Sequence, residues 1–283
     1  MLFSVEINRI MADITTSLVK ELRDRTNIGL IKCKKALIEA NGDIELAIDN
    51  LRKLGQATAD KKAKSLANQG LILIKIATNS KYGVIIELNS ETDFAVKNKE
   101  FIQFGEQVVT TALNKQIINL AVLKEELEQQ RIALVDKMGE NINISRLGVL
   151  KGNIEEDIIV SYLHGTRIGV IVSATTNNVL LSKQLVKNIA MHITAIKPEY
   201  VNEDDIPSHV MSREYQIQLN IAMQSNKSDE VTKKIIDGRM RQFIKNISLT
   251  HQNFVMDPSI TIQQLLYNNK IIVNKFIRFE VGE

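Results

Sequence analysis

A carboxylate and an aromatic ring stand side by side in the segment Thr92-Asp93-Phe94-Ala95. The apolar run 83–88 before it predicts a buried strand, and the amphipathic run 101–113 after it predicts a helix. Binding groups concentrate in loops between rigid elements, so Asp93 could approach a charge and Phe94 could enter a partner's pocket. A simpler interpretation makes Asp93 a turn or N-cap residue and places Phe94 in the core. These residues by themselves favour the simpler interpretation.

The remaining reactive side chains form no catalytic or metal-binding pattern. The histidines are scattered and lack the spacing of metal ligands; they are His164, His192, His209 and His251. The lone cysteine, Cys33, has no evident histidine partner, and no phosphate-binding glycine loop or nucleophile elbow is present. The sequence therefore favours a binding protein over an enzyme, with no catalytic residue, no metal and no cofactor.

One histidine is kept as a candidate binding residue. His164 opens a predicted turn beside Gly165. An imidazole there would be exposed to a partner, and a plain turn explains the pair equally well.

Length and composition describe a globular chain of two or three domains. It has 283 residues, of which 44% are hydrophobic, and a formal net charge of only +3. No apolar run approaches the ~18 residues of a membrane helix. A single cysteine excludes a disulfide framework and fits a reducing compartment. We therefore expect a cytoplasmic protein that does not contact a membrane.

Two alternative functions stay open at this point. The basic cluster Lys61-Lys62-Ala63-Lys64 would suit a nucleic-acid-binding module. A solvated linker explains the cluster more simply, so no direct nucleic-acid contact is expected. The other alternative is an enzyme whose site assembles from residues far apart in the sequence.

The N-terminal part is predicted to be a head followed by a helical bundle. Residues 1–11 are interpreted as an extra head, either disordered or translated from a start codon assigned too early. Residues 12–56 carry three short helices, separated near Asn27 and at Asn41-Gly42-Asp43, with Gly55 ending the third. Three helices of this size resemble a ubiquitin-associated-type (UBA-like) domain, with either a structural or a docking role.

The middle of the chain is predicted to be an α+β core in two related parts. Residues 57–69 are a polar linker, either helical or irregular, residues 70–150 form subdomain N, and residues 151–197 with 248–283 form subdomain C. Each part opens with a β-hairpin followed by a helix. Gly83-Val84-Ile85 and Gly169-Val170-Ile171 occupy equivalent places, which indicates a structural repeat.

Residues 198–247 interrupt subdomain C with two helices. Met211 and Tyr215 belong to the apolar seam of the first helix, and Met240 and Phe243 to that of the second. Facing seams and a short connection predict an antiparallel helical hairpin (coiled coil) that projects from the body. The predicted fold class is therefore α+β, with a helical bundle, a two-part core and an inserted helical hairpin.

Several separate motifs, in order, closely resemble the translation elongation factor Ts family. The resemblance covers residues 12–283, and its motifs are Ser17-Leu18-Val19-Lys20-Glu21-Leu22-Arg23, Cys33-Lys34-Lys35-Ala36-Leu37, Asn41-Gly42-Asp43, Thr92-Asp93-Phe94, His164-Gly165-Thr166-Arg167-Ile168-Gly169-Val170 and Phe276-Ile277-Arg278-Phe279-Glu280-Val281-Gly282. It implies the same three-part fold. It also implies a guanine-nucleotide exchange factor that binds elongation factor Tu, both GDP-bound and nucleotide-free, and releases GDP.

The resemblance assigns roles to three groups of residues. Thr92, Asp93, Phe94 and Ala95 match the segment that disturbs the Mg²⁺ site of Tu, with Phe94 as a wedge. An N-terminal patch of this chain would dock on the nucleotide-binding domain of Tu. Its residues would be Lys20, Arg23, Leu30 and Ile31. A contact in the core, facing another domain of Tu, would comprise His164 and Gly165.

The sequence also departs from the family pattern. Asn27-Ile28 stands where smaller residues are usual, and Ala95-Val96 inverts the usual order after the phenylalanine. The sequence ends at Glu283, before the helical tail that often follows in this family, and exchange is expected to be weaker for that reason. Association between two copies of the chain stays open.

Overall fold

The computed structural model describes residues 14–26, 28–223 and 229–283. The expected head of residues 1–11, Asn27 and the short connection expected between the two helices of the hairpin lie outside this part of the chain. The described residues form a mixed structure of helices and antiparallel sheets. The predicted α+β class is therefore confirmed.

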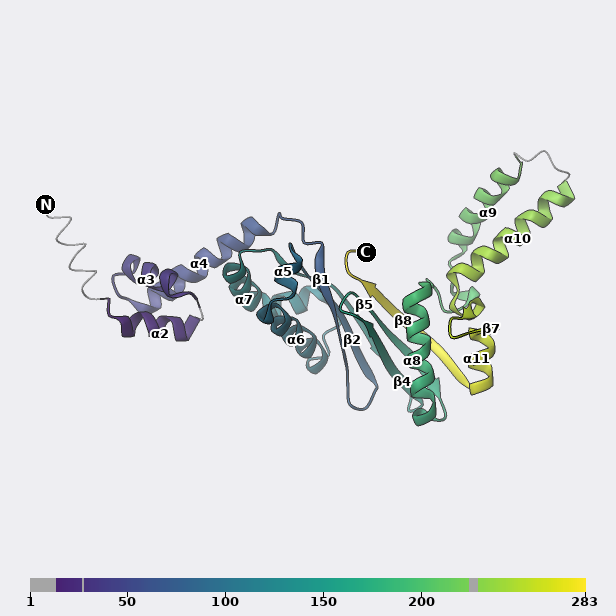
Figure 1. Ribbon diagram of the computed structural model, residues 1–283, viewed down its shortest axis with the longest axis horizontal. Coiled ribbons are helices and arrows are strands. Elements are labelled where there is room, and N and C mark those ends of the chain that lie inside the picture. Colours follow the sequence, from purple (N-terminus) through teal and green to yellow (C-terminus); the bar gives the residue numbers. More distant parts are fainter. Residues whose placement is uncertain (1–13, 27, 224–228) are drawn as a thin grey trace.

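Helices dominate both ends of the molecule, and the two three-stranded sheets lie between them (Figure 1). The helices are α2 (Thr16–Thr26), α3 (Leu30–Glu39), α4 (Ile44–Lys62), α5 (Asp93–Val96), α6 (Lys99–Asn114), α7 (Leu120–Met138), α8 (Val179–Ile196), α9 (Ser208–Met223), α10 (Asp229–Ile247) and α11 (Ile262–Asn269). The strands are β1 (Gln69–Ile76), β2 (Tyr82–Ser90), β3 (Ile142–Lys151), β4 (Asp157–His164), β5 (Ile168–Thr176), β6 (Asn253–Phe254), β7 (Asp257–Thr261) and β8 (Ile271–Glu280).

Helices α2, α3 and the first half of α4 pack around a small apolar cluster of their own, which includes Leu22, Leu37 and Leu51. Helix α4 begins where the sequence indicates, because Asp43 accepts a hydrogen bond from the backbone N–H of Leu46 at 3.0 Å.

The prediction that Gly55 ends the third helix is wrong. Helix α4 continues through Gly55 to Lys62, so the residues expected to begin a linker are helical. Alanine, glutamine and lysine after Gly55 are good helix formers, and they outweigh the cost of one glycine. The glycine also lets α4 lie close to α7, since a Cβ at this position would stand 3.3 Å from Cγ2 of Ile132.

Two three-stranded antiparallel sheets form the core, with the strand orders β1-β2-β3 and β4-β5-β8. In each sheet the third strand pairs with the second strand of the hairpin. The two sheets therefore repeat one arrangement, as the sequence predicts. Helices α6 and α7 cover the first sheet, and α8 and α11 cover the second.

The other faces of the two sheets pack against each other through Ile72, Ile85, Ile159 and Ile171. The equivalent glycines lie in this interface. A Cβ at Gly83 would approach Ile159 to 2.7 Å, and a Cβ at Gly169 would approach Ile72 to 2.6 Å. The repeated glycines are thus explained by close contact between the sheets.

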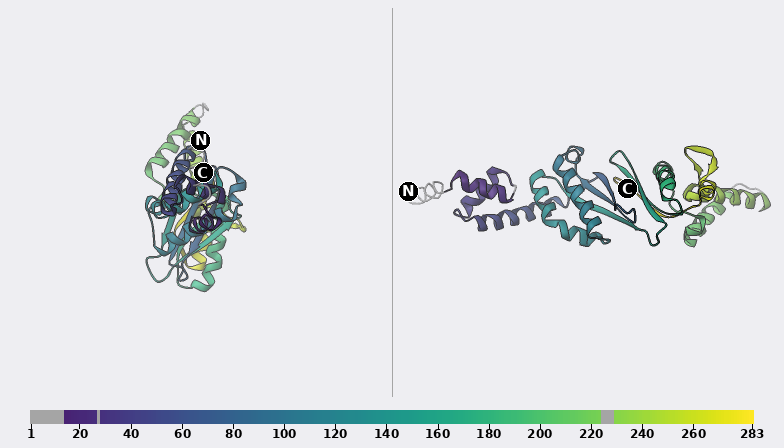
Figure 2. Two further views of the ribbon diagram at one scale, coloured as in Figure 1. Left: turned by 90° about the vertical axis from the view of Figure 1, so that its left-hand side faces the viewer. Right: turned by 90° about the horizontal axis from the view of Figure 1, so that it is seen from below.

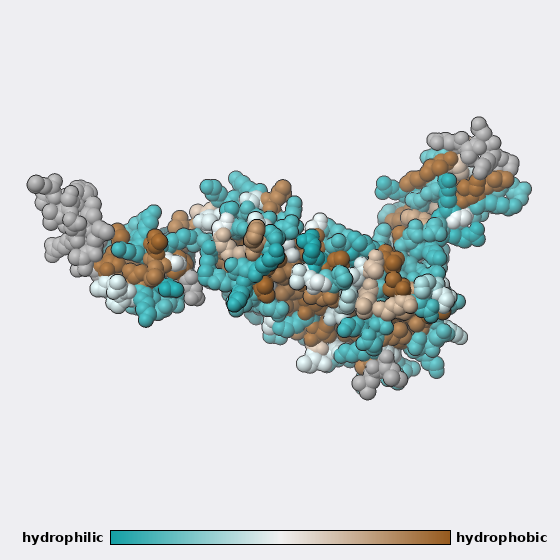
Figure 3. Space-filling view, in the orientation of Figure 1, coloured by the Kyte–Doolittle hydropathy of each residue, from teal (hydrophilic) through white to brown (hydrophobic). Residues whose placement is uncertain are grey.

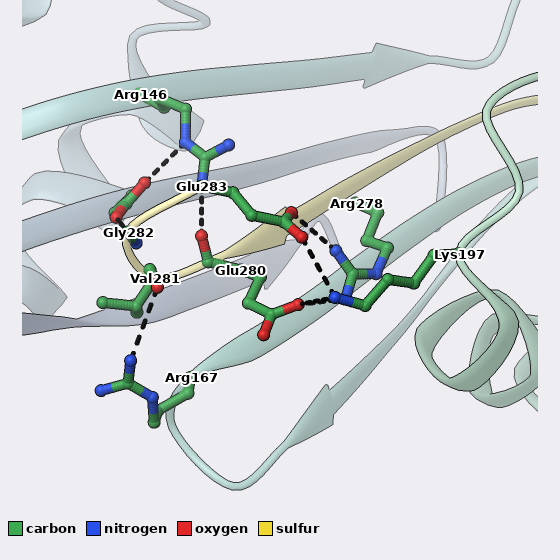
Figure 4. A network of polar contacts seen from close by, with 9 residues as sticks. Arg146, Arg167, Lys197, Arg278, Glu280, Val281, Gly282 and Glu283 are labelled. Carbon is green, nitrogen blue, oxygen red and sulfur yellow. Dashed lines mark hydrogen bonds and ion pairs between the residues drawn. The ribbon is translucent and has the colours of Figure 1, made fainter.

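A network of charged side chains joins the end of β8 to its neighbours (Figure 4). Arg146 of β3 contacts Glu87 of β2 at 2.5 Å and donates to the backbone carbonyl of Glu280 in β8. The Glu280 carboxylate in turn accepts hydrogen bonds from Lys197 and Arg278, which lower its pKa to about 2. The network links the two sheets and the end of α8.

The chain has an elongated shape, with α2–α4 at one end, the sheets in the middle and helices α9 and α10 at the other end (Figures 1 and 2). Helices α9 and α10 pack side by side and stand out from the body. Hydrophobic residues are visible along the outer part of this pair (Figure 3). Among the described residues, no helix combines the length and the apolar character needed to cross a bilayer.

Candidate interaction site on helix α5

Phe94 projects from the surface, with 80% of its area exposed. The simpler interpretation of the sequence, a core position for this ring, is therefore wrong. The reason is the short helix α5, which follows β2 directly and turns Ala95, 5% exposed, toward the core while Phe94 points away from it. Thr92 rather than Asp93 is the N-cap, because its hydroxyl accepts a hydrogen bond from the N–H of Ala95 at 3.2 Å.

Helix α5 is fastened to the core by Glu140, which follows α7. Its carboxylate accepts three hydrogen bonds: from the Thr92 backbone N–H at 3.1 Å, the Thr92 hydroxyl at 2.7 Å and the Ser90 hydroxyl at 2.9 Å. Hydrogen bonds to an ionised carboxylate are among the stronger ones in proteins. The base of the Phe94 projection is therefore held in one place.

A second carboxylate, Glu91, holds the same loop from the other side. It accepts a hydrogen bond from the backbone N–H of Asn141 at 2.7 Å and from Lys62 at the end of α4 at 3.2 Å. These contacts, first the one with Asn141, lower the pKa of Glu91 below its usual value. Asn141 also donates to the carbonyl of Ser65 at 2.8 Å. The end of α4, the loop before α5 and the start of β3 are thus joined.

Asp93 and Phe94 both interact with Lys97, one turn further along. The Lys97 ammonium lies 2.8 Å from the Asp93 carboxylate and 6.0 Å from the centre of the Phe94 ring. The hydrogen bond from Lys97 lowers the pKa of Asp93, so this carboxylate is ionised at neutral pH. All three side chains are exposed to solvent, so a partner would meet a ring flanked by one negative and one positive charge.

His164 is the last residue of β4 and pairs with Ile168, so it lies just before the turn rather than within it. Its ring is exposed, and Nδ1 lies 3.2 Å from the hydroxyl of Tyr162. Gly165 occupies the turn with a φ of +60°, a left-handed conformation that glycine adopts without strain. The ring is thus presented at a tight, exposed turn.

The structure places α5 and the His164 turn at the same end of the core. Gln69, the first residue of β1, pairs with Ser90 and also accepts a hydrogen bond from Arg167 at 3.4 Å. The N–H of Ile72 donates to the carbonyl of Thr166 at 2.8 Å. Strand β1 therefore lies between the two predicted contact regions and connects them.

The predicted N-terminal docking residues lie apart, on the bundle. Lys20 and Arg23 are exposed on α2, and Leu30 and Ile31 are exposed at the start of α3, the latter with 88% of its area. Helix α4 is the only covalent path from this surface to the core. The structure therefore presents two separated surfaces, one on the bundle and one on the core.

The described residues contain no group of three or more histidine, cysteine, aspartate or glutamate side chains that could hold a metal ion. A cavity of about 650 Å³ lies between the β1–β2 turn and α8, with Ser80, Ile159 and Lys187 among its lining residues. The lining residues that the structure describes include no histidine, cysteine or carboxylate. This cavity lies at the end of β1 and β2 that is opposite to α5.

Sequence reasoning missed the residues that support α5. Glu140 lies 48 positions after Thr92, and Asn141 lies 50 positions after Glu91. Contacts over such distances leave no periodic signal in a single sequence. The position of Glu140 just after Gly139, the glycine that ends α7, is the only local signal.

Comparison with known proteins identifies the family. The family model described as "Elongation factor TS" matches residues 91–283. Elongation factor Ts of Baumannia cicadellinicola subsp. Homalodisca coagulata is 60% identical over 273 residues, which cover 96% of this chain and 95% of that protein. The proteins of the same name from Sodalis glossinidius (strain morsitans) and Yersinia pestis (strain Pestoides F) are 59% and 57% identical, over 96% of this chain and 93% of each relative. With this agreement over nearly its whole length, the chain belongs to the elongation factor Ts family.

Proposed function

We propose that this protein is a guanine-nucleotide exchange factor that binds elongation factor Tu·GDP and promotes GDP release during translation elongation. Membership of the elongation factor Ts family supports this role. The observation that carries the proposal is the exposed Phe94, held on a capped and anchored helix. A function in translation elongation also supports a cytoplasmic location.

In the proposed mechanism, helix α5 acts on the Mg²⁺ site of Tu. Phe94 would enter between side chains of Tu, and Asp93 would contact the nucleotide-binding domain nearby, with Thr92 and Ala95 holding the turn that presents them. Mg²⁺ bridges the phosphates and the protein in nucleotide sites of this class. Its displacement removes charge neutralisation from the diphosphate, which weakens GDP binding.

The energetics require more than one contact surface. Weakening GDP about 1,000-fold needs ~4 kcal/mol of differential binding. Burying one phenylalanine supplies only ~1.5–3 kcal/mol. We therefore assign the rest to the docking patch of Lys20, Arg23, Leu30 and Ile31 and to the core contact at His164 and Gly165. These surfaces must bind best when the nucleotide site of Tu is distorted.

In the proposed domain organisation, each contact with Tu belongs to a different domain. The UBA-like bundle of residues 12–56 docks, and subdomain N of residues 70–150 carries the wedge. Subdomain C, residues 151–197 and 248–283, carries His164. The helical hairpin of residues 198–247 is an insertion in subdomain C. The packing of α2–α4 and of α9 against α10 supports these assignments.

Replacement of Phe94 tests the proposal directly. Phe94→Ala should slow GDP release from Tu at least tenfold, measured with a fluorescent GDP analogue, while binding to nucleotide-free Tu weakens much less. The reason is that a wedge acts on the distorted state of the nucleotide site, whereas docking uses the other surfaces as well.

Tyr267→Ala is the matched control, because Tyr267 is an aromatic residue on α11 with 85% of its area exposed. It should leave both quantities unchanged. Equal losses of release rate and docking affinity in Phe94→Ala would count against a wedge.

A further inference from the structure

The bundle is attached to the core first of all through a shared helix. Leu51 of α4 belongs to the apolar cluster of the bundle, whereas Ala59 of the same helix belongs to the cluster of the first sheet. Between them, Gly55 packs against Ile132 of α7. This packing restrains α4 itself, whereas the orientation of α2 and α3 depends in addition on any contacts that they make with the core.

A second attachment lies away from α4. Lys32 of α3 reaches the last turn of α7, where its ammonium lies 2.8 Å from both carboxylate oxygens of Asp136 and 3.2 Å from the Asp136 backbone carbonyl. The Asp136 side chain is only 9% exposed, whereas that of Lys32 is 45% exposed. Within the part of the chain that the structure describes, no other ion pair joins α2 or α3 to the core.

The space beside this ion pair is not filled by apolar packing. A cleft of about 570 Å³ separates the bundle from α7, with Ile28 and Arg52 on the bundle side and Gln129 and Ala133 on the α7 side. A tightly packed interface would resist rotation by itself. Here the Lys32–Asp136 contact has to supply that resistance on the α3 side of the cleft.

We propose that the Lys32–Asp136 ion pair is a clamp that sets the orientation of the bundle relative to the core. Lys32 comes directly after Leu30 and Ile31, which are exposed on the same helix. The clamp therefore fixes where these two apolar side chains stand relative to Phe94. As far as exchange is concerned, this inference rests on the proposed function, in which both surfaces engage Tu together.

The first experiment measures orientation without any partner. Nitroxide labels are placed on exposed positions of α3 and α7 as Lys34→Cys and Glu125→Cys in a Cys33→Ala background, and the distance distribution is recorded by pulsed electron spin resonance. Lys32→Ala should broaden the distribution, and the charge-reversed pair Lys32→Asp with Asp136→Lys should restore its width.

Salt provides a second test on the same labelled protein. At 1 M salt the Debye length is about 3 Å, so this ion pair is screened on its exposed Lys32 side. The distribution of the parent protein should then broaden toward that of Lys32→Ala. The matched control is Lys35→Ala, because Lys35 pairs with Glu39 at 3.9 Å within α3 itself. This variant should behave as the parent protein at every salt concentration.

The second experiment measures GDP release from Tu with the unlabelled variants. Lys32→Ala should lower the apparent second-order rate about tenfold, equivalent to about 1.4 kcal/mol. Lys32→Arg and the charge-reversed pair should recover most of it. Neither Lys32 nor Asp136 needs to touch Tu for this result.

The outcomes separate the clamp from the proposed function. Identical distance distributions in the parent and Lys32→Ala would overturn the clamp. A broadened distribution with an unchanged release rate would overturn its role in exchange. If the parent protein itself does not accelerate GDP release, the proposed function fails, while the distance measurements still decide whether the clamp exists.

Discussion

At the scale of single residues, an exposed aromatic ring is useful to a binding protein only if its base is immobile. Ordering a loose backbone costs about 1–2 kcal/mol per residue, which would be subtracted from the affinity for a partner. Here Thr92 caps α5, and Glu140 accepts both hydrogens that Thr92 offers. Most of the ordering of this segment is therefore completed on folding rather than on binding.

Replacement of Glu140 should loosen helix α5 while it leaves the Phe94 side chain itself unchanged. Glu140→Ala removes three hydrogen bonds to a carboxylate and leaves the Thr92 N–H without its partner. We expect a loss of roughly 1.5–3 kcal/mol in the free energy of unfolding. Hydrogen exchange of the amides from Thr92 to Lys97 should become at least tenfold faster.

The control is Glu125→Ala, because Glu125 is exposed on α7. It should change neither the stability nor the exchange of these amides. Unaltered protection of the α5 amides in Glu140→Ala would show that α5 does not depend on this carboxylate.

At this scale, the sequence does not predict contacts between residues that lie far apart along the chain. The segment around Phe94 could be singled out because a carboxylate, a ring and two strong element signals are adjacent. The direction of the ring could not be derived from periodicity, since α5 has only one turn. Its supports come from Glu140 and Asn141, which only the folded chain brings near.

At the scale of elements, α8 carries a histidine that joins this helix to the segment 252–255. His192 is fully buried; its Nε2 lies 2.9 Å from the side-chain oxygen of Gln252, and its Nδ1 accepts a hydrogen bond from the N–H of Val255 at 3.2 Å. A nitrogen that accepts carries no proton, so the ring is neutral with its hydrogen on Nε2. Burial lowers the pKa of this imidazole below 6.5.

This arrangement predicts a pH-dependent stability. The unfolded chain binds a proton at His192 more readily than the folded chain, so stability is complete above pH 6.5 and falls as the pH drops toward the lowered pKa. The slope should be at most about 1.4 kcal/mol per pH unit. It can be measured by urea unfolding between pH 8 and pH 5.

His192→Gln should flatten this slope and cost about 1–2 kcal/mol at pH 8, because a buried hydrogen bond is lost. His209→Gln is the control, since His209 is exposed on α9, and it should retain the slope of the parent protein. An identical slope in the parent and His192→Gln would assign the pH dependence to other groups.

Elements could be predicted where their signals are local. The apolar runs that became β1, β2, β4 and β5 lie between turn residues, and Gly139 ends α7 in a left-handed conformation, φ +71°. The end of α4 was mispredicted because Gly55 was interpreted as a stop signal, whereas its role is close packing against Ile132. A glycine in a helical sequence can end the helix or allow another element to pack closely against it. Only the position of the neighbouring helix shows which of the two applies.

At the scale of the whole molecule, two similar sheets are joined face to face, and one arginine connects three of their strands. Arg146 of β3 contacts the carboxylate of Glu87 in β2 and the carbonyl of Glu280 in β8, and its guanidinium lies 4.4 Å from the centre of the Phe279 ring. Glu87 is 3% exposed and also accepts a hydrogen bond from the N–H of Gly282 at 3.0 Å. The C-terminal strand is thereby tied to the first sheet as well as to its own.

Removing the arginine should therefore weaken the connection between the two sheets. Arg146→Met leaves the buried Glu87 carboxylate without its cation, which should cost roughly 3–5 kcal/mol in the free energy of unfolding. Adding Glu87→Gln should recover a large part of this loss, because the uncompensated charge is then absent.

Arg167→Met is the control, since Arg167 is exposed and its hydrogen bonds of 3.4 Å and 3.5 Å are long. This variant should cost less than ~1 kcal/mol in the free energy of unfolding. Urea unfolding followed by circular dichroism measures all four proteins. If the double variant is no more stable than Arg146→Met, the arginine acts through its packing on Phe279 rather than by neutralising Glu87.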